Sequence, residues 1–121
     1  FSGEIPVKGP GIRVSIPSSL EGIWLVDIVN ELFTAGAEAI SVNSLRLTDT
    51  TIGFDSSLSG QILLNGTPLS PPFIIRAIGD KKTLEQALRQ AGGIIARIKS
   101  AYPDVLIDIA LEDVIEMSAA L

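Results

Sequence analysis

Two stretches of the chain, residues 12–34 and 73–102, each place a strand pattern directly before a helix pattern, and this repetition limits the available folds. Residues 12–16 alternate apolar and polar side chains, which is typical of a strand with one buried face. Residues 73–79 are almost continuously apolar, as expected of a strand in the middle of a sheet. Apolar residues at helical spacing follow both strands. The sequence therefore predicts two strand-helix units that share one core.

The first helix has signals at both ends. Ser18 followed by Glu21 matches a capping box, in which the two side chains satisfy free backbone N–H groups at a helix start. Gly36 follows the last apolar position and can adopt the left-handed conformation that commonly ends a helix. These signals predict a helix between Ser18 and Gly36.

The second helix is predicted as one long element. Asp80 can cap its start, and the Tyr102-Pro103 pair ends it. Gly92 and Gly93 fall in the middle, where each glycine costs about 1 kcal/mol relative to alanine. We expect a bend or a close helix contact at these two glycines.

Further strands complete the pattern. Residues 38–43 and 105–112 alternate as strands, while residues 45–48 and 51–54 resemble short strand pieces. The Asn65-Gly66 pair between extended residues predicts a tight hairpin, because both positions of a type I′ turn need positive φ. The Gly-Pro-Gly sequence at 9–11 precedes a strand, so we interpret it as an entry turn and not as a phosphate-binding loop.

This element order predicts an α+β fold, a ferredoxin-like βαββαβ two-layer sandwich with an inserted extra hairpin, formed by residues 1–121 as a single domain. Right-handed crossovers place both helices on one sheet face, which leaves the other face uncovered. The strand alternation assigns five polar residues to that uncovered face: Arg13, Ser15, Ser41, Asn43 and Asp108.

The composition excludes several functions. The chain has no cysteine and no histidine, which removes thiolate nucleophiles, Ser-His-Asp relays and imidazole or thiolate metal sites. We expect no cofactor and no metal centre. The net charge of −5 and the absence of a basic stripe argue against nucleic acid as a partner. The apolar runs are far shorter than the roughly 20 residues of a membrane span, so membrane contact would need a segment N-terminal to Phe1.

Two polar residues at a predicted strand end are candidate binding residues. Asn43 is assigned to the uncovered face, and Arg46 can donate a fork of hydrogen bonds to a carboxylate or to backbone carbonyls. Arg13 on the same face joins them as a third candidate for ligand or partner binding. The alternative for Asn43 and Arg46 is structural, since both could hold the following turn in shape.

Four stretches of the chain together resemble the YlxW/YlxX-like family of uncharacterised bacterial proteins. They are VKGPGIRVSI, IVNELFTAGAEAISVNSLRL, ILLNGTPLSPPFIIRAIGD and TLEQAL. The resemblance implies a domain outside the cytoplasm, held by an N-terminal membrane helix and a coiled coil, with a role in the cell envelope or in cell division. No activity is established for the family, so no catalytic residue is carried over.

We therefore expect a non-catalytic protein-interaction domain of a single-pass membrane protein. Its partner would be a second copy of itself, in a homodimer, or an envelope or division protein. The first alternative is a small-ligand sensor, in which two domains pair and bind a ligand near Asn43 and Arg46. The second alternative is a hydrolase of ferredoxin-like fold.

Overall fold

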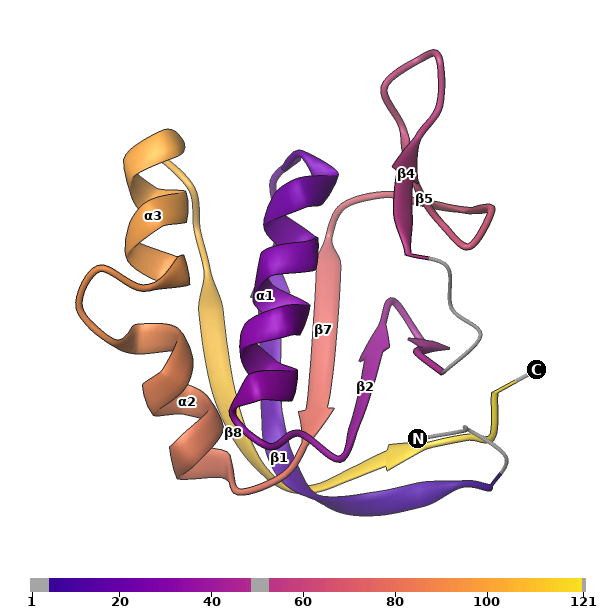
Figure 1. Ribbon diagram of the computed structural model, residues 1–121, viewed down its shortest axis with the longest axis vertical. Coiled ribbons are helices and arrows are strands. Elements are labelled where there is room, and N and C mark those ends of the chain that lie inside the picture. Colours follow the sequence, from indigo (N-terminus) through magenta and orange to yellow (C-terminus); the bar gives the residue numbers. More distant parts are fainter. Residues whose placement is uncertain (1–4, 49–52, 121) are drawn as a thin grey trace.

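The computed structural model describes residues 5–48 and 53–120, which form a mixed α+β fold with two antiparallel sheets and three helices (Figure 1). The five-stranded sheet has the order β3 (Leu45–Arg46), β2 (Ala39–Val42), β7 (Phe73–Ile78), β1 (Val7–Ile16) and β8 (Asp108–Met117). The three-stranded sheet contains β4 (Phe54–Ser56), β5 (Ile62–Leu64) and β6 (Thr67–Leu69). The helices are α1 (Gly22–Thr34), α2 (Lys81–Arg89) and α3 (Ile94–Ala101).

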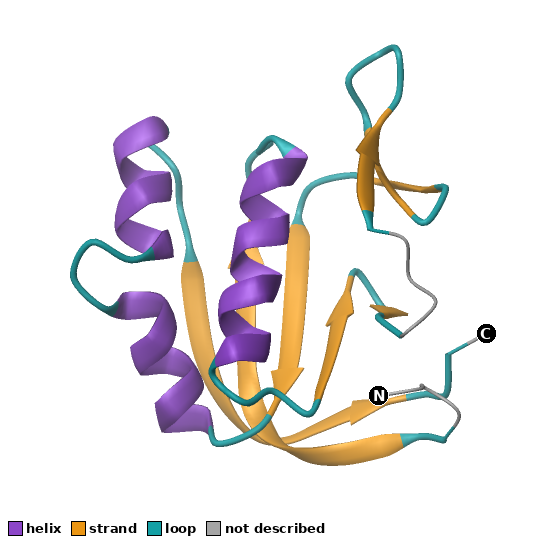
Figure 2. Ribbon diagram, in the orientation of Figure 1, coloured by secondary structure: helices purple, strands orange, loops and turns teal. Residues whose placement is uncertain are grey.

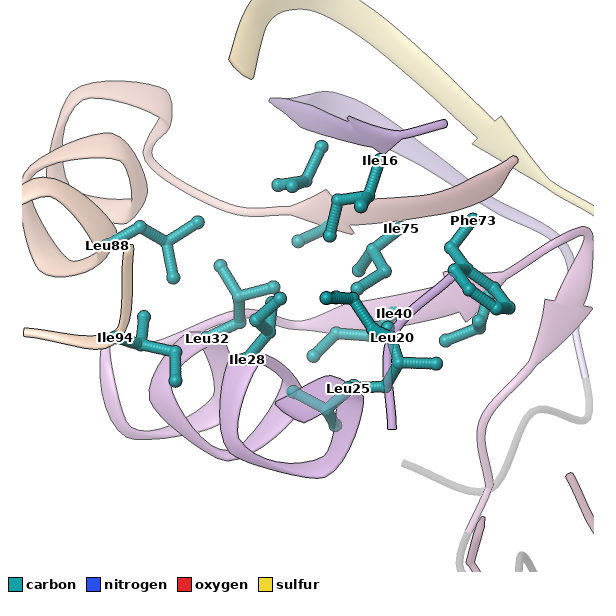
Figure 3. Close-up of a cluster of buried hydrophobic side chains, with 14 of the residues drawn as sticks. Ile16, Leu20, Leu25, Ile28, Leu32, Ile40, Phe73, Ile75, Leu88 and Ile94 are labelled. Atoms are coloured by element: carbon teal, nitrogen blue, oxygen red, sulfur yellow. The ribbon is translucent and has the colours of Figure 1, made fainter. Parts of the chain in front are cut away.

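The helices gather on one side of the five-stranded sheet (Figure 2). Alternate strand residues point toward them and are fully buried, among them Ile16, Ile40 and Ile75. These side chains meet the apolar faces of the helices in one continuous core (Figure 3). We call the other face of this sheet, opposite the three helices, the helix-free face.

Helix α1 begins later than the predicted capping box. Glu21 is the extended residue before the helix, and no side chain caps the start of α1. Ser18 lies outside the helix, so the capping-box prediction is wrong. The prediction for Gly36 is confirmed, because Gly36 has a φ of 99° and follows the last helical turn. Its N–H donates to the carbonyl of Phe33 over 3.0 Å, as in a Schellman motif.

The predicted long second helix is two helices, α2 and α3. Gly92 has a φ of 72°, which breaks the helical path, and Gly93 is the extended residue at the start of α3. The prediction of Asp80 as a cap is confirmed, since its carboxylate accepts from the Thr83 N–H at 3.0 Å and from the Thr83 hydroxyl at 2.6 Å. These hydrogen bonds lower the pKa of Asp80 from its ordinary value of 3.8.

Strand β1 is twice the predicted length, because the Gly-Pro-Gly sequence lies within it and is not an entry turn. The pairing of β1 with β8 shifts between Gly9 and Gly11, which marks a β-bulge. A Cβ atom on Gly11 would lie 1.8 Å from the carbonyl oxygen of Ala77 on β7. Only glycine at this position permits such a close strand approach.

The predicted hairpin at Asn65-Gly66 is confirmed. The two residues have φ values of 49° and 84° and connect β5 to β6. The predicted strands at 45–48 and 51–54 correspond in part to β3 and β4, but residues 51 and 52 lie outside the described residues. Among the helices of the described ranges, none combines the length and apolarity that crossing a membrane requires.

Candidate functional site

A row of polar side chains crosses the helix-free face at right angles to the strands. Ser41 on β2 pairs with Arg46 on β3 and with Arg76 on β7, and Arg76 pairs in turn with Arg13 on β1. Neighbouring strands lie roughly 4.8 Å apart and paired residues point to the same side. The row therefore runs over four neighbouring strands and places three arginines on one face. Ser41, between Arg46 and Arg76, is buried, with 4% of its surface exposed.

One end of the helix-free face is bordered by an arm, defined as residues 7–11 of β1 and 112–117 of β8. Figure 1 shows this pair of strands continuing past the helices as a curved ribbon. Its residues Ile115 and Met117 pack against Ala39 and Ile78 of the five-stranded sheet in a small second apolar cluster. The arm is thus fixed to the helix-free face by its own apolar contacts.

An ion pair also ties the arm to the helices. The ammonium group of Lys81, the first residue of α2, donates to the carboxylate of Asp113 on β8. This hydrogen bond and the charge of Lys81 lower the pKa of Asp113 from its ordinary value of 3.8. Asp113 is highly exposed, so the pair orients the arm more than it stabilises the fold.

Arg46 connects β3 to both ends of the described chain. Its guanidinium donates to the backbone carbonyl of Ile5 and, over 3.3 Å, to that of Ser118. Its Nε atom is inaccessible to solvent and has no hydrogen-bond acceptor in the described structure. Within the described residues Arg46 therefore donates only to backbone carbonyls, which leaves one donor unsatisfied and the guanidinium without an acidic partner.

The arginines differ in how their charges are balanced. Arg13 forms an ion pair with Glu112, with 2.6 Å between Nη1 and Oε1. Arg76 is half-buried, and within residues 5–48 and 53–120 it has neither a hydrogen bond nor an ion pair. Half-burying a charged guanidinium removes hydration that no described protein group replaces. Arg76 is therefore the member of the row most available to an external ligand.

A groove of about 800 Å³ opens beside the row. Its walls come from β3 and the turn before it, the hairpin between β5 and β6, and residues 116–120 at the end of the arm. Arg46 and Arg76 both line it, together with Ser41. A smaller cavity of about 190 Å³ lies on the other side of Arg76 and is lined by Arg13, Glu112 and Glu116. Arg76 and Glu116 are shared by the two cavities.

Asn43 lies in the turn between β2 and β3 and not on the helix-free face to which alternation assigned it. Its φ is 49°, and its side-chain oxygen accepts from the N–H of Ile74 at 2.7 Å. Its side-chain NH₂ donates to the carbonyl of Ser70 at 3.2 Å. Asn43 therefore fastens the turn to the start of β7, while a binding role for Asn43 stays a prediction.

Of the predicted candidates, Arg13 and Arg46 lie in the same row, with Arg76 between them. Sequence reasoning omitted Arg76 because residues 73–79 look like a strand buried on both sides. The signal was present in that segment, since Ile74 and Arg76 alternate with Phe73, Ile75 and Ala77, and only the latter three are buried. The groove wall at residues 116–120 had no comparable signal.

The fold and this site define an α+β domain with helices on one sheet face and a groove lined by arginines on the other. A family model described as "Bacterial protein of unknown function (DUF881)" matches residues 1–120, and the chain belongs to that family. This family, together with the YlxW relative described next, confirms the resemblance to the YlxW/YlxX-like family of uncharacterised bacterial proteins.

Curated relatives and a solved structure agree with this assignment. A UPF0749 protein of Mycobacterium tuberculosis (strain ATCC 25618 / H37Rv) is 35% identical over 97 residues, which cover 75% of this chain and 33% of the relative. The UPF0749 protein YlxW of Bacillus subtilis (strain 168) is 30% identical over 119 residues, covering 87% of this chain and 50% of the relative. The chain thus spans between a third and half of the length of these relatives.

The solved structure is described as that of an uncharacterized conserved protein from Mycobacterium tuberculosis. It superimposes with a TM-score of 0.85 at 29% identity, over 98% of this chain and 85% of the other chain. The two chains therefore share their fold over nearly the whole of this 121-residue sequence.

Proposed function

We propose that the chain is a non-catalytic protein-recognition domain that binds its partner through the groove on the helix-free face. The observation that carries the proposal is Arg76, a half-buried guanidinium that lines both cavities and has no partner within the described part of the chain. Arginine is enriched at protein–protein interfaces and among the residues that contribute most to their binding energy. The absence of histidine and cysteine from the sequence supports recognition over hydrolysis.

The proposed scaffold is the ferredoxin-like sandwich with an inserted extra hairpin. Two connections support it: α1 joins β1 to β2, and α2 with α3 joins β7 to β8. The order β2-β7-β1-β8 within the sheet is the one this arrangement requires. The inserted part is then β3, β4, β5 and β6, and both β3 and the hairpin of β5 and β6 supply walls of the groove.

The proposed setting follows from the family resemblance. The domain would stand outside the cytoplasm as part of a single-pass membrane protein and would bind an envelope or division protein, or a second copy of itself. The greater length of the curated relatives leaves room for an anchoring segment in such proteins.

Site-specific photocrosslinking in cells tests the recognition surface. A photoreactive amino acid is placed in the full-length protein at Ser44 or Thr67, two exposed positions that line the groove. The matched controls carry it at Lys82 or Gln86, two exposed positions on α2. We expect a discrete crosslinked protein from the groove positions and none from α2. Equal crosslinking from both sets, or crosslinking from α2 alone, would contradict the proposal.

A small-ligand sensor is the second candidate, and the groove volume of about 800 Å³ favours it, since small-molecule sites typically enclose roughly 300–1,000 Å³. A thermal-shift screen of amino acids, nucleotides and cell-wall fragments separates the two candidates. A compound that raises the melting temperature of the wild type but not of Arg46→Ala would favour the sensor.

A further inference from the structure

We propose that the groove binds the carboxylate side chains of an acidic peptide segment, with Arg76 as the principal contact and Arg46 beside it. This inference rests on the proposed function and adds the chemistry of the segment that is recognised. The partner would present glutamate or aspartate side chains from an extended or loosely structured stretch.

The distribution of charge over the chain favours an acidic partner for the groove. The chain has a net charge of −5, yet three of its five arginines, Arg13, Arg46 and Arg76, share one cross-strand row. The ion pair with Glu112 neutralises Arg13, whereas the partners of Arg46 among the described residues are backbone carbonyls, which carry no negative charge. A positive site on an otherwise acidic surface attracts an acidic partner and repels a basic one.

The hydrogen-bonding geometry of the arginines favours a carboxylate as the bound group. A guanidinium presents its donors in a planar fork that matches the two oxygens of a carboxylate. Within the described residues the guanidinium of Arg76 is unpaired, so a bound carboxylate would satisfy donors that those residues leave open. Arg46 lines the same groove and adds its positive charge. Glu116 is the single acidic residue among the described residues that line the groove, so repulsion of an anion there is limited.

The shape and lining of the groove favour a peptide over a free anion or a phosphate. Its described lining contains no lysine and no helix N-terminus, the features that hold phosphate groups in most proteins. Hydroxyl and amide groups of Ser44, Asn65 and Thr67 alternate there with apolar side chains such as Leu45 and Leu64. Such a mixed surface can bind backbone amides and apolar side chains as well as carboxylates.

The test measures fluorescence anisotropy of a labelled ten-residue peptide in which glutamate alternates with serine. The control peptide has glutamine in place of glutamate. Wild-type protein is compared with Arg76→Gln and with Arg89→Gln, which removes the same charge from the exposed surface of α2. We expect the glutamate peptide to bind more tightly at low salt than at high salt. Arg76→Gln should weaken binding about tenfold, as for loss of a charge-assisted pair, and Arg89→Gln less than about twofold.

Each other outcome overturns the inference. Equal binding of the glutamine peptide would exclude carboxylate recognition, and equal losses in Arg76→Gln and Arg89→Gln would show only an effect of net charge. Competition by free citrate at the peptide's own concentration would assign the site to a small carboxylate. Because Arg76 makes no hydrogen bond or ion pair in the described structure, Arg76→Gln should melt no lower than wild type, so misfolding does not obscure the result.

The two experiments can refute acidic-peptide binding without refuting protein recognition, and the reverse. If the glutamate peptide does not bind but Ser44 and Thr67 still crosslink to a protein, the acidic-peptide inference is wrong and the recognition function stands. If the peptide binds but the groove positions give no crosslink in cells, the groove has the stated chemistry and the proposed protein partner is wrong.

Discussion

Replacing Gly11 with alanine is expected to destabilise the fold by about 3 kcal/mol, which lowers the melting temperature by roughly 10 °C. The added Cβ would lie 1.8 Å from the carbonyl oxygen of Ala77 and 2.8 Å from its carbonyl carbon. Ala77 belongs to β7, which is held between β1 and β2, so this backbone cannot move aside without breaking ladder hydrogen bonds. Thermal unfolding followed by circular dichroism measures the loss.

Gly22→Ala is the matched control for Gly11→Ala. A Cβ on Gly22, the first residue of α1, would meet Ile62 and Phe54 at an ordinary contact distance of 3.8 Å. Alanine there reduces the freedom of the unfolded chain, so we expect a change of less than about 1 kcal/mol and toward higher stability. A Gly11→Ala protein as stable as Gly22→Ala would show that β1 and β7 are not as close as described.

Asn43→Ala is expected to lower the free energy of unfolding by about 2–5 kcal/mol. Two effects add: alanine at a φ of 49° is strained by roughly 1–2 kcal/mol, and the N–H of Ile74 loses its acceptor, which costs about 1–3 kcal/mol. Urea unfolding at constant m-value measures the difference. The size of this effect means that an Asn43→Ala protein tests turn structure before it tests binding.

Two further substitutions separate the effects at Asn43. Asn43→Gly relieves the backbone strain but still leaves the N–H of Ile74 without an acceptor, so about half of the loss in unfolding free energy should remain. Asn43→Asp keeps an oxygen for the N–H of Ile74 and loses the donor to the carbonyl of Ser70, so it should be the mildest of the three. If all three substitutions were equally costly, the hydrogen bond to Ile74 would not be the main stabilising contact.

Gly11 also links stability to the site. The bulge between Gly9 and Gly11 lies where β1 and β8 leave the main sheet as the arm, and bulges increase local twist. The arm carries Glu116 and leads to residues 116–120, which form one wall of the groove. The same backbone irregularity therefore helps to shape both the sheet and the candidate binding surface.

Period-two alternation predicted the helix-free face well where strands are regular. It assigned Arg13 and Ser41 correctly, because both neighbours of each residue in the sequence are fully buried. For Arg13 these neighbours are Ile12 and Val14. It failed at Asn43, since a turn residue with positive φ no longer alternates. Strand alternation therefore predicts a face only as far as the extended backbone continues.

The missed features depend on contacts between distant residues. Gly-Pro-Gly normally marks a turn, and its place within β1 becomes apparent only through the close approach of Ala77 to Gly11. The last strand was predicted over residues 105–112, whereas β8 runs from Asp108 to Met117, because Ile115 and Met117 are buried against Ala39 and Ile78, far away in sequence. Arm and groove are thus products of tertiary packing, which local patterns do not encode.

Amide chemical-shift mapping is the most direct test of the helix-free face as the binding surface. The ¹⁵N-labelled chain is titrated with the alternating glutamate-serine peptide, and the shifts of assigned backbone amides are followed. The largest changes are predicted at Ser41, Arg46, Arg76 and Glu116, with α1 and α2 unaffected. Largest changes on α1 or α2, or no change at a saturating peptide concentration, would contradict the assignment of binding to this face.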